Sequence, residues 1–310
     1  MKTVFIDGSA GTTGLRIYER LSARKDLQLM ILPDAVRKDP EARKQALNSC
    51  DVAFLCLPDA AAMEAVSLIE NNHVTVLDTS TAHRTDPDWA YGFPELGEEF
   101  LEKLLHSRRI AVPGCHASGF ISLVSPLVKA GILNPDVRLT CHSITGYSGG
   151  GKKMIAQYQE DDRDVLLGAP RQYGLTQNHK HLKEMKAICG LEHAPIFCPI
   201  VSDFYSGMVV TVPLFKEDLA AGKTMADIQA VYSAQYQGPM VTYKTQMDEE
   251  GFLSGAGLSG KDTMEVTVCG NEDRMILVAR YDNLGKGASG AAVQCLNLVL
   301  GVEPTTGLEL

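Results

Sequence analysis

The sequence lacks the features that mark secreted, membrane-bound and nucleic-acid-binding proteins. No apolar stretch approaches the length of a membrane span, and the N-terminal residues predict no signal peptide. No run of like charges forms a tail, and the formal net charge of −9 disfavours the phosphate backbone of a nucleic acid as a partner. We therefore expect a cytoplasmic protein that binds a small molecule and neither a membrane nor a nucleic acid.

The eight cysteines lack the regular spacing of a disulfide framework. The chain also has no Cys-x-x-Cys pair and no His-Glu-x-x-His motif, so we expect no metal site. Both absences fit a reducing compartment. Most of the cysteines lie in apolar strands or near helix ends, where a cysteine acts as a small buried hydrophobe.

One cysteine, Cys115, stands where a predicted strand turns into a predicted helix. The apolar run 110–112 predicts the strand, Pro113-Gly114 breaks it, and an apolar helical pattern follows over 120–128. A cysteine in the first turn of a helix faces unpaired backbone N–H groups and the positive end of the helix dipole, which favour the thiolate. Cys115 is therefore the candidate nucleophile, and the alternative is one more buried cysteine without chemistry.

The length of 310 residues suggests two domains, and the hydrophobic content of 45% is ample for a sizeable core. In the first third, apolar strands without alternation are separated by helical periods. This pattern is typical of an α/β fold with a Rossmann-type, doubly wound parallel sheet covered on both faces. The predicted strands are 3–6, 27–32, 52–57, 74–77 and 110–112, and the predicted helices are 13–24, 40–47, 60–70 and 96–105.

After about residue 131 the strands become longer and alternate, which predicts an α+β catalytic domain with a mainly antiparallel sheet. A hairpin turn is expected at 271–274. The final helix, 288–300, is expected to return to the first domain, so the predicted domains are 1–114 with 285–310 and 115–284. The predicted strands of the second domain are 137–144, 196–201, 208–214, 265–268 and 275–281, and a helix is predicted over 225–236.

The turn between the first strand and the first helix has the spacing Gly-x-x-Gly-x-x-Gly. Glycines here allow a tight turn and let the backbone approach a pyrophosphate that rests on the helix N-terminus. The strand before the turn and the helix after it favour a dinucleotide site over an ordinary glycine turn. The predicted cofactor contacts are Gly8, Ser9, Gly11, Thr12, Thr13 and Gly14.

The end of the second strand discriminates between nicotinamide cofactors. Asp34 there would hold the ribose hydroxyls of NAD, whereas Arg37 and Lys38 suit the 2′-phosphate of NADP. The alternative to a cofactor contact is that these residues belong to a solvated loop. We expect NADP, with Arg37 as a contact.

Seven motifs, taken in order, resemble the short (type 2) form of N-acetyl-gamma-glutamyl-phosphate reductase, which belongs with aspartate-semialdehyde dehydrogenase in a wider superfamily. The similarity covers nearly the whole chain, and the number and order of the motifs make it specific. The long-form enzymes usually follow the cysteine with Tyr-Pro-Thr, whereas this chain has His-Ala-Ser after Cys115. The motifs lie at 8–14, 55–59, 78–84, 113–115, 146–151, 178–181 and 282–287.

This resemblance implies an NADP-dependent, aldehyde-forming oxidoreductase of arginine biosynthesis. Its reaction would be the reductive dephosphorylation of N-acetyl-glutamyl 5-phosphate to N-acetyl-glutamate 5-semialdehyde through a thioester on Cys115. It also implies a homo-oligomer, either a dimer or a tetramer.

The resemblance also implies roles for two histidines, because the family carries a His-x-His motif where this chain has His179 and His181. We assign His181 as the acid/base and His179 as a substrate contact; without the resemblance both would be surface histidines. Arg84 follows a strand end and suits an oxyanion, the alternative being a surface salt bridge. The other expected contacts are Ser148 for the substrate and Ser80 and Asn283 for the cofactor.

Two alternatives remain open at this point. One is the same chemistry on aspartyl phosphate or N-acetyl-aminoadipyl phosphate. The other is a nicotinamide-binding sensor that has lost catalysis. Fast alkylation of Cys115 with protection by substrate favours the enzyme over the sensor.

Overall fold

The computed structural model describes residues 1–310, and the chain divides into two compact units. The first unit comprises Met1–Pro94, Glu98–Pro113 and Ala288–Leu308, and the second comprises Glu95–Gly97, Gly114–Gly287 and Glu309–Leu310. No helix is long and apolar enough to cross a membrane.

The first unit is built on a six-stranded sheet in the order β2-β1-β3-β4-β6-β5, and all of its pairings are parallel. The order reverses between β1 and β3, which is the place where ligands bind in open α/β sheets. The fold predicted from the uninterrupted apolar runs is confirmed. The strands are β1 (Lys2–Asp7), β2 (Leu27–Met30), β3 (Val52–Leu55), β4 (Thr75–Asp78), β5 (Ala90–Tyr91) and β6 (Arg109–Ala111).

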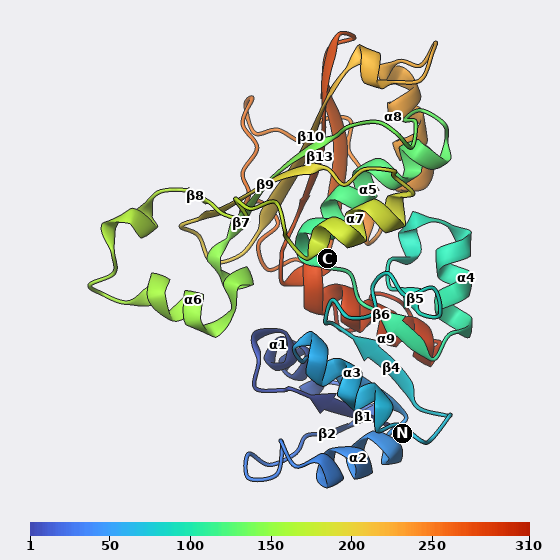
Figure 1. Ribbon diagram of the computed structural model, residues 1–310, viewed down its shortest axis with the longest axis vertical. Coiled ribbons are helices and arrows are strands. Elements are labelled where there is room, and N and C mark those ends of the chain that lie inside the picture. The colour runs from blue at the N-terminus through green and yellow to red at the C-terminus, as the bar shows by residue number, and fades with distance from the viewer. The chain divides into compact units, whose positions relative to one another are not determined.

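Helices cover both faces of this sheet (Figure 1). Along β1, Val4 and Ile6 enter one apolar core with α1, α4 and α9, while Phe5 enters the other with α2 and α3. Because both faces are covered, the strand needs no polar alternation. The helices are α1 (Thr12–Ser22), α2 (Pro40–Ser49), α3 (Asp59–Ser67), α4 (Glu98–His106) and α9 (Gly290–Leu300).

The second unit has a seven-stranded sheet in the order β11-β12-β13-β10-β7-β9-β8. Four of its six pairings are antiparallel, as predicted, and the other two, β11 with β12 and β7 with β9, are parallel. The predicted hairpin turn joins β12 to β13. The strands are β7 (Thr140–Gly146), β8 (Arg171–Gln172), β9 (Ile196–Ser202), β10 (Met208–Phe215), β11 (Val241–Tyr243), β12 (Met264–Gly270) and β13 (Arg274–Tyr281).

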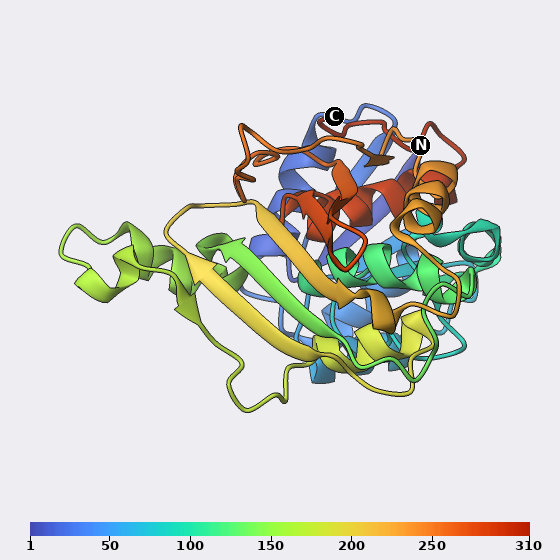
Figure 2. The same cartoon turned by 90° about the horizontal axis from the view of Figure 1, so that it is seen from above.

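Helices α5 (Cys115–Lys129), α7 (His181–Cys189) and α8 (Met225–Gln235) lie on one side of this sheet (Figure 2). On the strands the buried residues alternate with exposed ones, and the exposed apolar side chains include Ile144, Ile196, Phe215 and Ile276. The chain around α6 (Gly151–Gln159) extends away from the sheet in both views. Short helical turns lie at η1 (Pro94–Leu96), η2 (Tyr147–Gly150), η3 (Val165–Gly168), η4 (Lys216–Asp218) and η5 (Gly285–Ser289).

Helix α5 begins at Cys115, in agreement with the prediction that this cysteine lies in a first helical turn, and thus starts five residues before the apolar pattern over 120–128. Its first residues, Cys-His-Ala-Ser-Gly, include several weak helix formers, so local propensity underestimates the helix. Every residue from His116 to Leu127 is buried. Tertiary burial therefore decides the conformation here, as it does for helix interiors in general.

Candidate active site

Cys115 is the first residue of α5, directly after the N-cap residue Gly114. Gly114 has an extended backbone, with φ −81° and ψ 146°, and no side chain caps the helix from this position. No acidic residue lies in the first turn. The half-buried Cys115 side chain thus begins a helix whose own first turn adds no negative charge.

Glu184 connects the turn before Cys115 to a second helix. The backbone N–H of Gly114 donates to Glu184 Oε1 at 2.8 Å, and the Glu184 side chain is buried. Glu184 belongs to α7, whose first residue is His181. One buried hydrogen bond therefore links the turn before Cys115 to the helix that begins with His181.

Three histidine rings gather beside this turn. The ring centroid of His116 lies 5.6 Å from that of His181 and 5.8 Å from that of His179, and the last two are 4.7 Å apart. The backbone N–H of His181 donates to His179 Nδ1 at 3.2 Å, which makes that nitrogen an acceptor and leaves the His179 proton on Nε2. Burial, with a smaller effect of Lys180, lowers the pKa of His179, which favours the neutral ring.

His116, the residue directly after the candidate nucleophile, is fully enclosed. Its Nδ1 contacts the hydroxyl of Ser143 and its Nε2 that of Tyr173, each at 2.6 Å. Burial, and secondarily His179, lowers the pKa of His116 to about 3. A ring that stays neutral, with both nitrogens engaged, is suited to order the cluster and not to exchange protons near neutral pH.

Acidification should destabilise the folded chain through His116. The unfolded-state pKa is about 6.5, so between that pH and about 3 the unfolded chain binds a proton that the folded one excludes. Above about 6.5 the ring is neutral in both states and has no effect. The free energy of unfolding should therefore fall as the pH is lowered through this window, by at most about 1.4 kcal/mol per pH unit.

Urea unfolding across this pH window measures the effect. His116→Gln should show a shallower fall in the free energy of unfolding than the parent chain. The matched control is His73→Gln, because His73 is exposed. An unchanged slope in His116→Gln would contradict the assignment.

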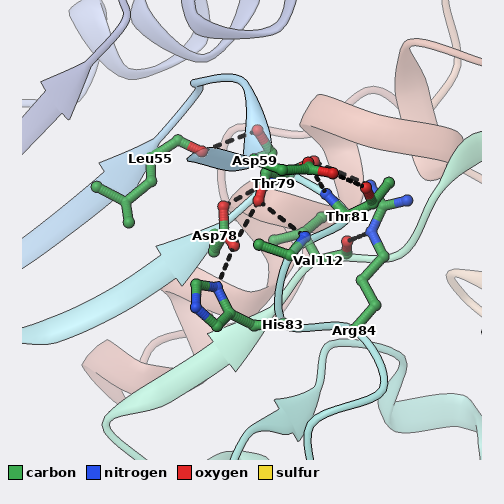
Figure 3. A network of polar contacts seen from close by, with 10 residues as sticks. Leu55, Asp59, Asp78, Thr79, Thr81, His83, Arg84 and Val112 are labelled. Atoms are coloured by element: carbon green, nitrogen blue, oxygen red, sulfur yellow. Dashed lines mark hydrogen bonds and ion pairs between the residues drawn. The ribbon is translucent and has the colours of Figure 1, made fainter. Parts of the chain in front are cut away.

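In the first unit, the carboxyl end of β4 holds a buried polar network (Figure 3). Asp78 accepts hydrogen bonds from the Ser80 hydroxyl and from His83 Nδ1, each at 2.7 Å, and the His83 ring stacks on Trp89 with centroids 4.0 Å apart. The Ser80 hydroxyl oxygen also accepts the N–H of Ala82 at 3.1 Å. Ser80 therefore orders this strand end, and its predicted contact with the cofactor stays a prediction.

Arg84 is buried at the same edge of the sheet. Its Nε donates to the carbonyl of Val112 at 2.8 Å, and its Nη2 to the carbonyl of Thr79 at 2.9 Å (Figure 3). The guanidinium thus ties together the chain segments that follow β4 and β6. A surface salt bridge, the alternative considered for Arg84, does not describe this environment, and its contact with substrate stays a prediction.

The glycine turn after β1 has the geometry that a pyrophosphate requires. Gly8 has φ +84°, and a Cβ there would lie 2.3 Å from the carbonyl oxygen of Cys56. A Cβ on Gly14 would lie 2.4 Å from the carbonyl oxygen of Gly8, so the helix packs directly on the turn. Helix α1 has no side-chain cap and no acidic residue in its first turn. Its N–H groups therefore suit a bound anion, and the residues present fit a dinucleotide.

In the loop after β2, the residue expected to favour NAD and the residue expected to favour NADP form an ion pair with each other. Arg37 Nε lies 3.0 Å from Asp34 Oδ1, and both side chains are exposed. A pair of this kind stabilises the fold little, so Arg37 is able to exchange Asp34 for another anion at small cost.

Comparison with known proteins assigns the family. Residues 3–104 match the model for the semialdehyde dehydrogenase NAD binding domain, and residues 115–283 match that for the semialdehyde dehydrogenase dimerisation domain. The N-acetyl-gamma-glutamyl-phosphate reductase of Rhizobium meliloti (strain 1021) is 46% identical over 304 residues, covering 96% of this chain and 98% of that one. This chain belongs to the N-acetyl-gamma-glutamyl-phosphate reductase family. The reductase of Brucella ovis is 45% identical over 305 residues, again covering 96% of this chain and 98% of that one.

Solved structures agree on the fold. The aspartate semialdehyde dehydrogenase of Francisella tularensis superposes with a TM-score of 0.72 at 14% identity, covering 97% of this chain and 100% of that chain. The corresponding values for aspartate semialdehyde dehydrogenase II of Vibrio cholerae are 0.71 and 17%, covering 97% and 99%. The predicted family is thus confirmed, the chain is an oxidoreductase, and its cofactor is a nicotinamide dinucleotide.

Two reductase residues predicted to bind different ligands lie in contact with each other. Asn283 Nδ2 donates to the Ser148 hydroxyl at 2.9 Å, and the N–H of Gly207 donates to Asn283 Oδ1 at 2.9 Å. Both side chains are buried. These bonds use part of the hydrogen-bonding capacity of the amide, and the two ligand contacts stay predictions.

Sequence reasoning missed Glu184, Tyr173 and Tyr281. Glu184 looks like an exposed residue of a helical first turn, and Tyr281 like an ordinary strand residue. The Tyr281 hydroxyl donates to the carbonyl oxygen of Cys115 at 2.5 Å. The spacing of three residues between His181 and Glu184 was the available signal, because such residues share a helix face.

Proposed function

We propose that this chain catalyses the NADP-dependent reductive dephosphorylation of N-acetyl-glutamyl 5-phosphate to N-acetyl-glutamate 5-semialdehyde, a step of arginine biosynthesis. The observation that carries the proposal is the position of Cys115 at the start of α5, next to the cluster formed by His116, His179 and His181. This arrangement combines a nucleophile with a group able to exchange protons. The names of the relatives supply the substrate.

Cys115 opens the reaction as a thiolate. Its sulfur attacks the acyl carbon of the substrate, the bond between that carbon and the phosphate oxygen breaks, and inorganic phosphate leaves with the electron pair. The product on the enzyme is a thioester of Cys115. The N-terminal end of α5 favours the thiolate before this step, because its N–H groups and dipole oppose the negative charge.

Bound NADPH supplies the hydride that reduces the thioester. His181 is the proposed acid/base: it holds a proton at the oxygen of the resulting thiohemiacetal and removes it as the carbon–sulfur bond breaks, which releases the aldehyde and restores the thiolate. His116 keeps the neighbouring ring cluster ordered from the buried side. The proposed substrate contacts are His179, Arg84 and Ser148, and the proposed cofactor contacts are the residues of the 8–14 turn, Arg37, Ser80 and Asn283.

The cofactor preference should depend on the loop after β2. Replacing Arg37 and Lys38 together by alanine is expected to raise the KM for NADP about tenfold to a hundredfold and to leave the KM for NAD within about twofold, because a 2′-phosphate loses two charged partners. A matched control removes two exposed lysines of the same unit, Lys25 and Lys103. An unchanged ratio of the two KM values would contradict the assignment.

The assembly is proposed to be a homo-oligomer, a dimer or a tetramer. The face of the second unit's sheet that exposes Ile144, Ile196, Phe215 and Ile276 would be the contact, because an apolar face of this kind favours association. The name of the matched dimerisation domain supports this proposal.

A coupled assay of the purified protein tests the function. The protein is supplied with phosphate, NADP or NAD, and each of three semialdehydes: N-acetyl-glutamate 5-semialdehyde, its one-carbon-longer homologue and aspartate semialdehyde. Phosphate-dependent reduction of NADP with the first alone is the expected result. Preference for another semialdehyde would contradict the proposed substrate. Tight NADP binding without turnover of any semialdehyde would favour the sensor alternative.

A further inference from the structure

The hydroxyl of Tyr281 lies within the backbone of the first turn of α5. It donates to the carbonyl oxygen of Cys115 at 2.5 Å and accepts the N–H of Gly119 at 3.1 Å. In an undisturbed α-helix that N–H would bond directly to the same carbonyl. The phenol thus contacts both backbone groups that close the turn carrying Cys115, a place where a side chain is able to influence the local helix geometry.

Two glycines make room for this arrangement. A Cβ on Gly119 would lie 2.6 Å from the Tyr281 hydroxyl, so a larger residue there would displace it. A Cβ on Gly287 would lie 3.2 Å from Cys115 Cβ and 3.3 Å from the Tyr281 ring. Cys115, Tyr281 and Gly287 are therefore neighbours, and the small size of both glycines preserves the contact between phenol and helix.

A second tyrosine that contacts α5, Tyr236 at the end of α8, shows what a purely structural contact requires. The hydroxyl of Tyr236 donates to the carbonyl of Ser122 at 2.6 Å. Pro126 lies four residues after Ser122 inside α5 and has no N–H, so that carbonyl lacks its helical donor. Tyr236 replaces the missing donor and satisfies the buried backbone.

The carbonyl that Tyr281 contacts does not lack a helical donor. The carbonyl of Cys115 has the N–H of Gly119 four residues further on, and the two would satisfy each other without any side chain. The hydroxyl therefore adds two hydrogen bonds to a turn whose backbone groups are able to pair with each other. Burial, followed by the charge of Cys115, raises the pKa of Tyr281 far above its usual value, so the phenol remains a donor at working pH.

We propose that Tyr281 is a positioning residue for the nucleophile: its hydroxyl sets the geometry of the first turn of α5 and thereby the direction of the Cys115 thiol relative to the N–H groups of that turn. The inference rests on the proposed function of Cys115. Two other buried tyrosines donate to carbonyls further along α5, Tyr232 to Leu123 and Tyr236 to Ser122. Tyr281 differs from both because its hydroxyl contacts the two backbone groups of the turn that carries Cys115.

Tyr281→Phe removes the hydroxyl and keeps the ring, and Tyr236→Phe is the matched control. For Tyr281→Phe we expect kcat to fall about tenfold, KM to stay within about twofold, and alkylation of Cys115 by iodoacetamide near neutral pH to slow about tenfold, which corresponds to the loss of one hydrogen bond. Tyr236→Phe should lower resistance to urea and leave both rates within about twofold. Mass spectrometry assigns the alkylated cysteine.

Equal rates in Tyr281→Phe and the parent chain, or equal losses in both variants, would overturn the proposal. The parent chain tests the proposed function separately: if its Cys115 reacts no faster than an ordinary thiol, the nucleophile assignment fails before Tyr281 is considered. If Tyr281→Phe does not fold, the double variant Gly119→Ala/Val210→Gly displaces the hydroxyl and removes both Val210 side-chain atoms that the new methyl group would meet, and it is expected to lower both rates in the same way.

Discussion

Cys115→Ser is expected to lower the phosphate-dependent reduction of NADP by the semialdehyde at least about a thousandfold, to the level of the blank. A serine hydroxyl at the start of α5 stays protonated near neutral pH, so no thioester forms. Binding of NADP should stay within about twofold, because the predicted cofactor contacts do not include this side chain. Initial rates and a fluorescence titration with NADPH measure the two effects.

The control for this variant is Cys269→Ser, since Cys269 is the exposed cysteine of the chain. It should retain full turnover. Rapid alkylation in the parent chain is expected at Cys115 alone and should be blocked by substrate. Turnover of Cys115→Ser near that of the parent would remove the nucleophile from the mechanism and leave the sensor alternative.

His181→Asn should lower kcat by about a hundredfold to ten-thousandfold, the range that a single acid/base group contributes. The asparagine fills much of the same volume at the start of α7 but does not exchange a proton near neutral pH. NADP affinity should remain within about twofold. The comparison variant His179→Asn should act mainly on the KM of the acyl substrate, because its assigned role is a substrate contact.

The pH profile separates these two roles further. The kcat of the parent chain should depend on a group that His181→Asn removes and His179→Asn keeps. The control is His106→Asn, because His106 is exposed on α4. If His179→Asn lowers kcat more strongly than His181→Asn, the two roles are reversed. If His181→Asn changes cofactor affinity alone, the acid/base assignment is wrong.

Some elements could be predicted because their cause is local. Each strand of the first sheet is an apolar run between turn residues, and burial on both faces makes the run continuous, as β1 shows with Val4, Phe5 and Ile6 on opposite faces. Strand β5 spans two residues, too short for any period to appear. The apolar pattern of α5 begins only at residue 120, and burial holds the weak helix formers before it in the helix.

The residues of the candidate site also fall into those with a local sequence signal and those without one. Cys115, His179 and His181 were predicted as site residues from a turn, a helix and a motif, which are short-range signals. Glu184 and Tyr281 were missed because each reaches the nucleophile turn from a residue remote in the chain, 70 residues from Gly114 for Glu184 and 166 residues from Cys115 for Tyr281. A contact between residues so far apart in the chain leaves no periodic pattern in the sequence.

The sequence alone determined the doubly wound sheet and the reductase family, and it supplied the predicted glycine turn for the dinucleotide and the candidate nucleophile. These features are visible in short stretches of sequence, where hydrophobic periodicity and turn residues reveal the local structure. Only the tertiary structure decided the environment of each group: His116 became a neutral ring enclosed between two hydroxyls, and Arg84 became the tie between two strand ends. The physical reason is that desolvation and hydrogen-bond partners depend on what packs around a side chain, and that is set by parts of the chain far away in sequence.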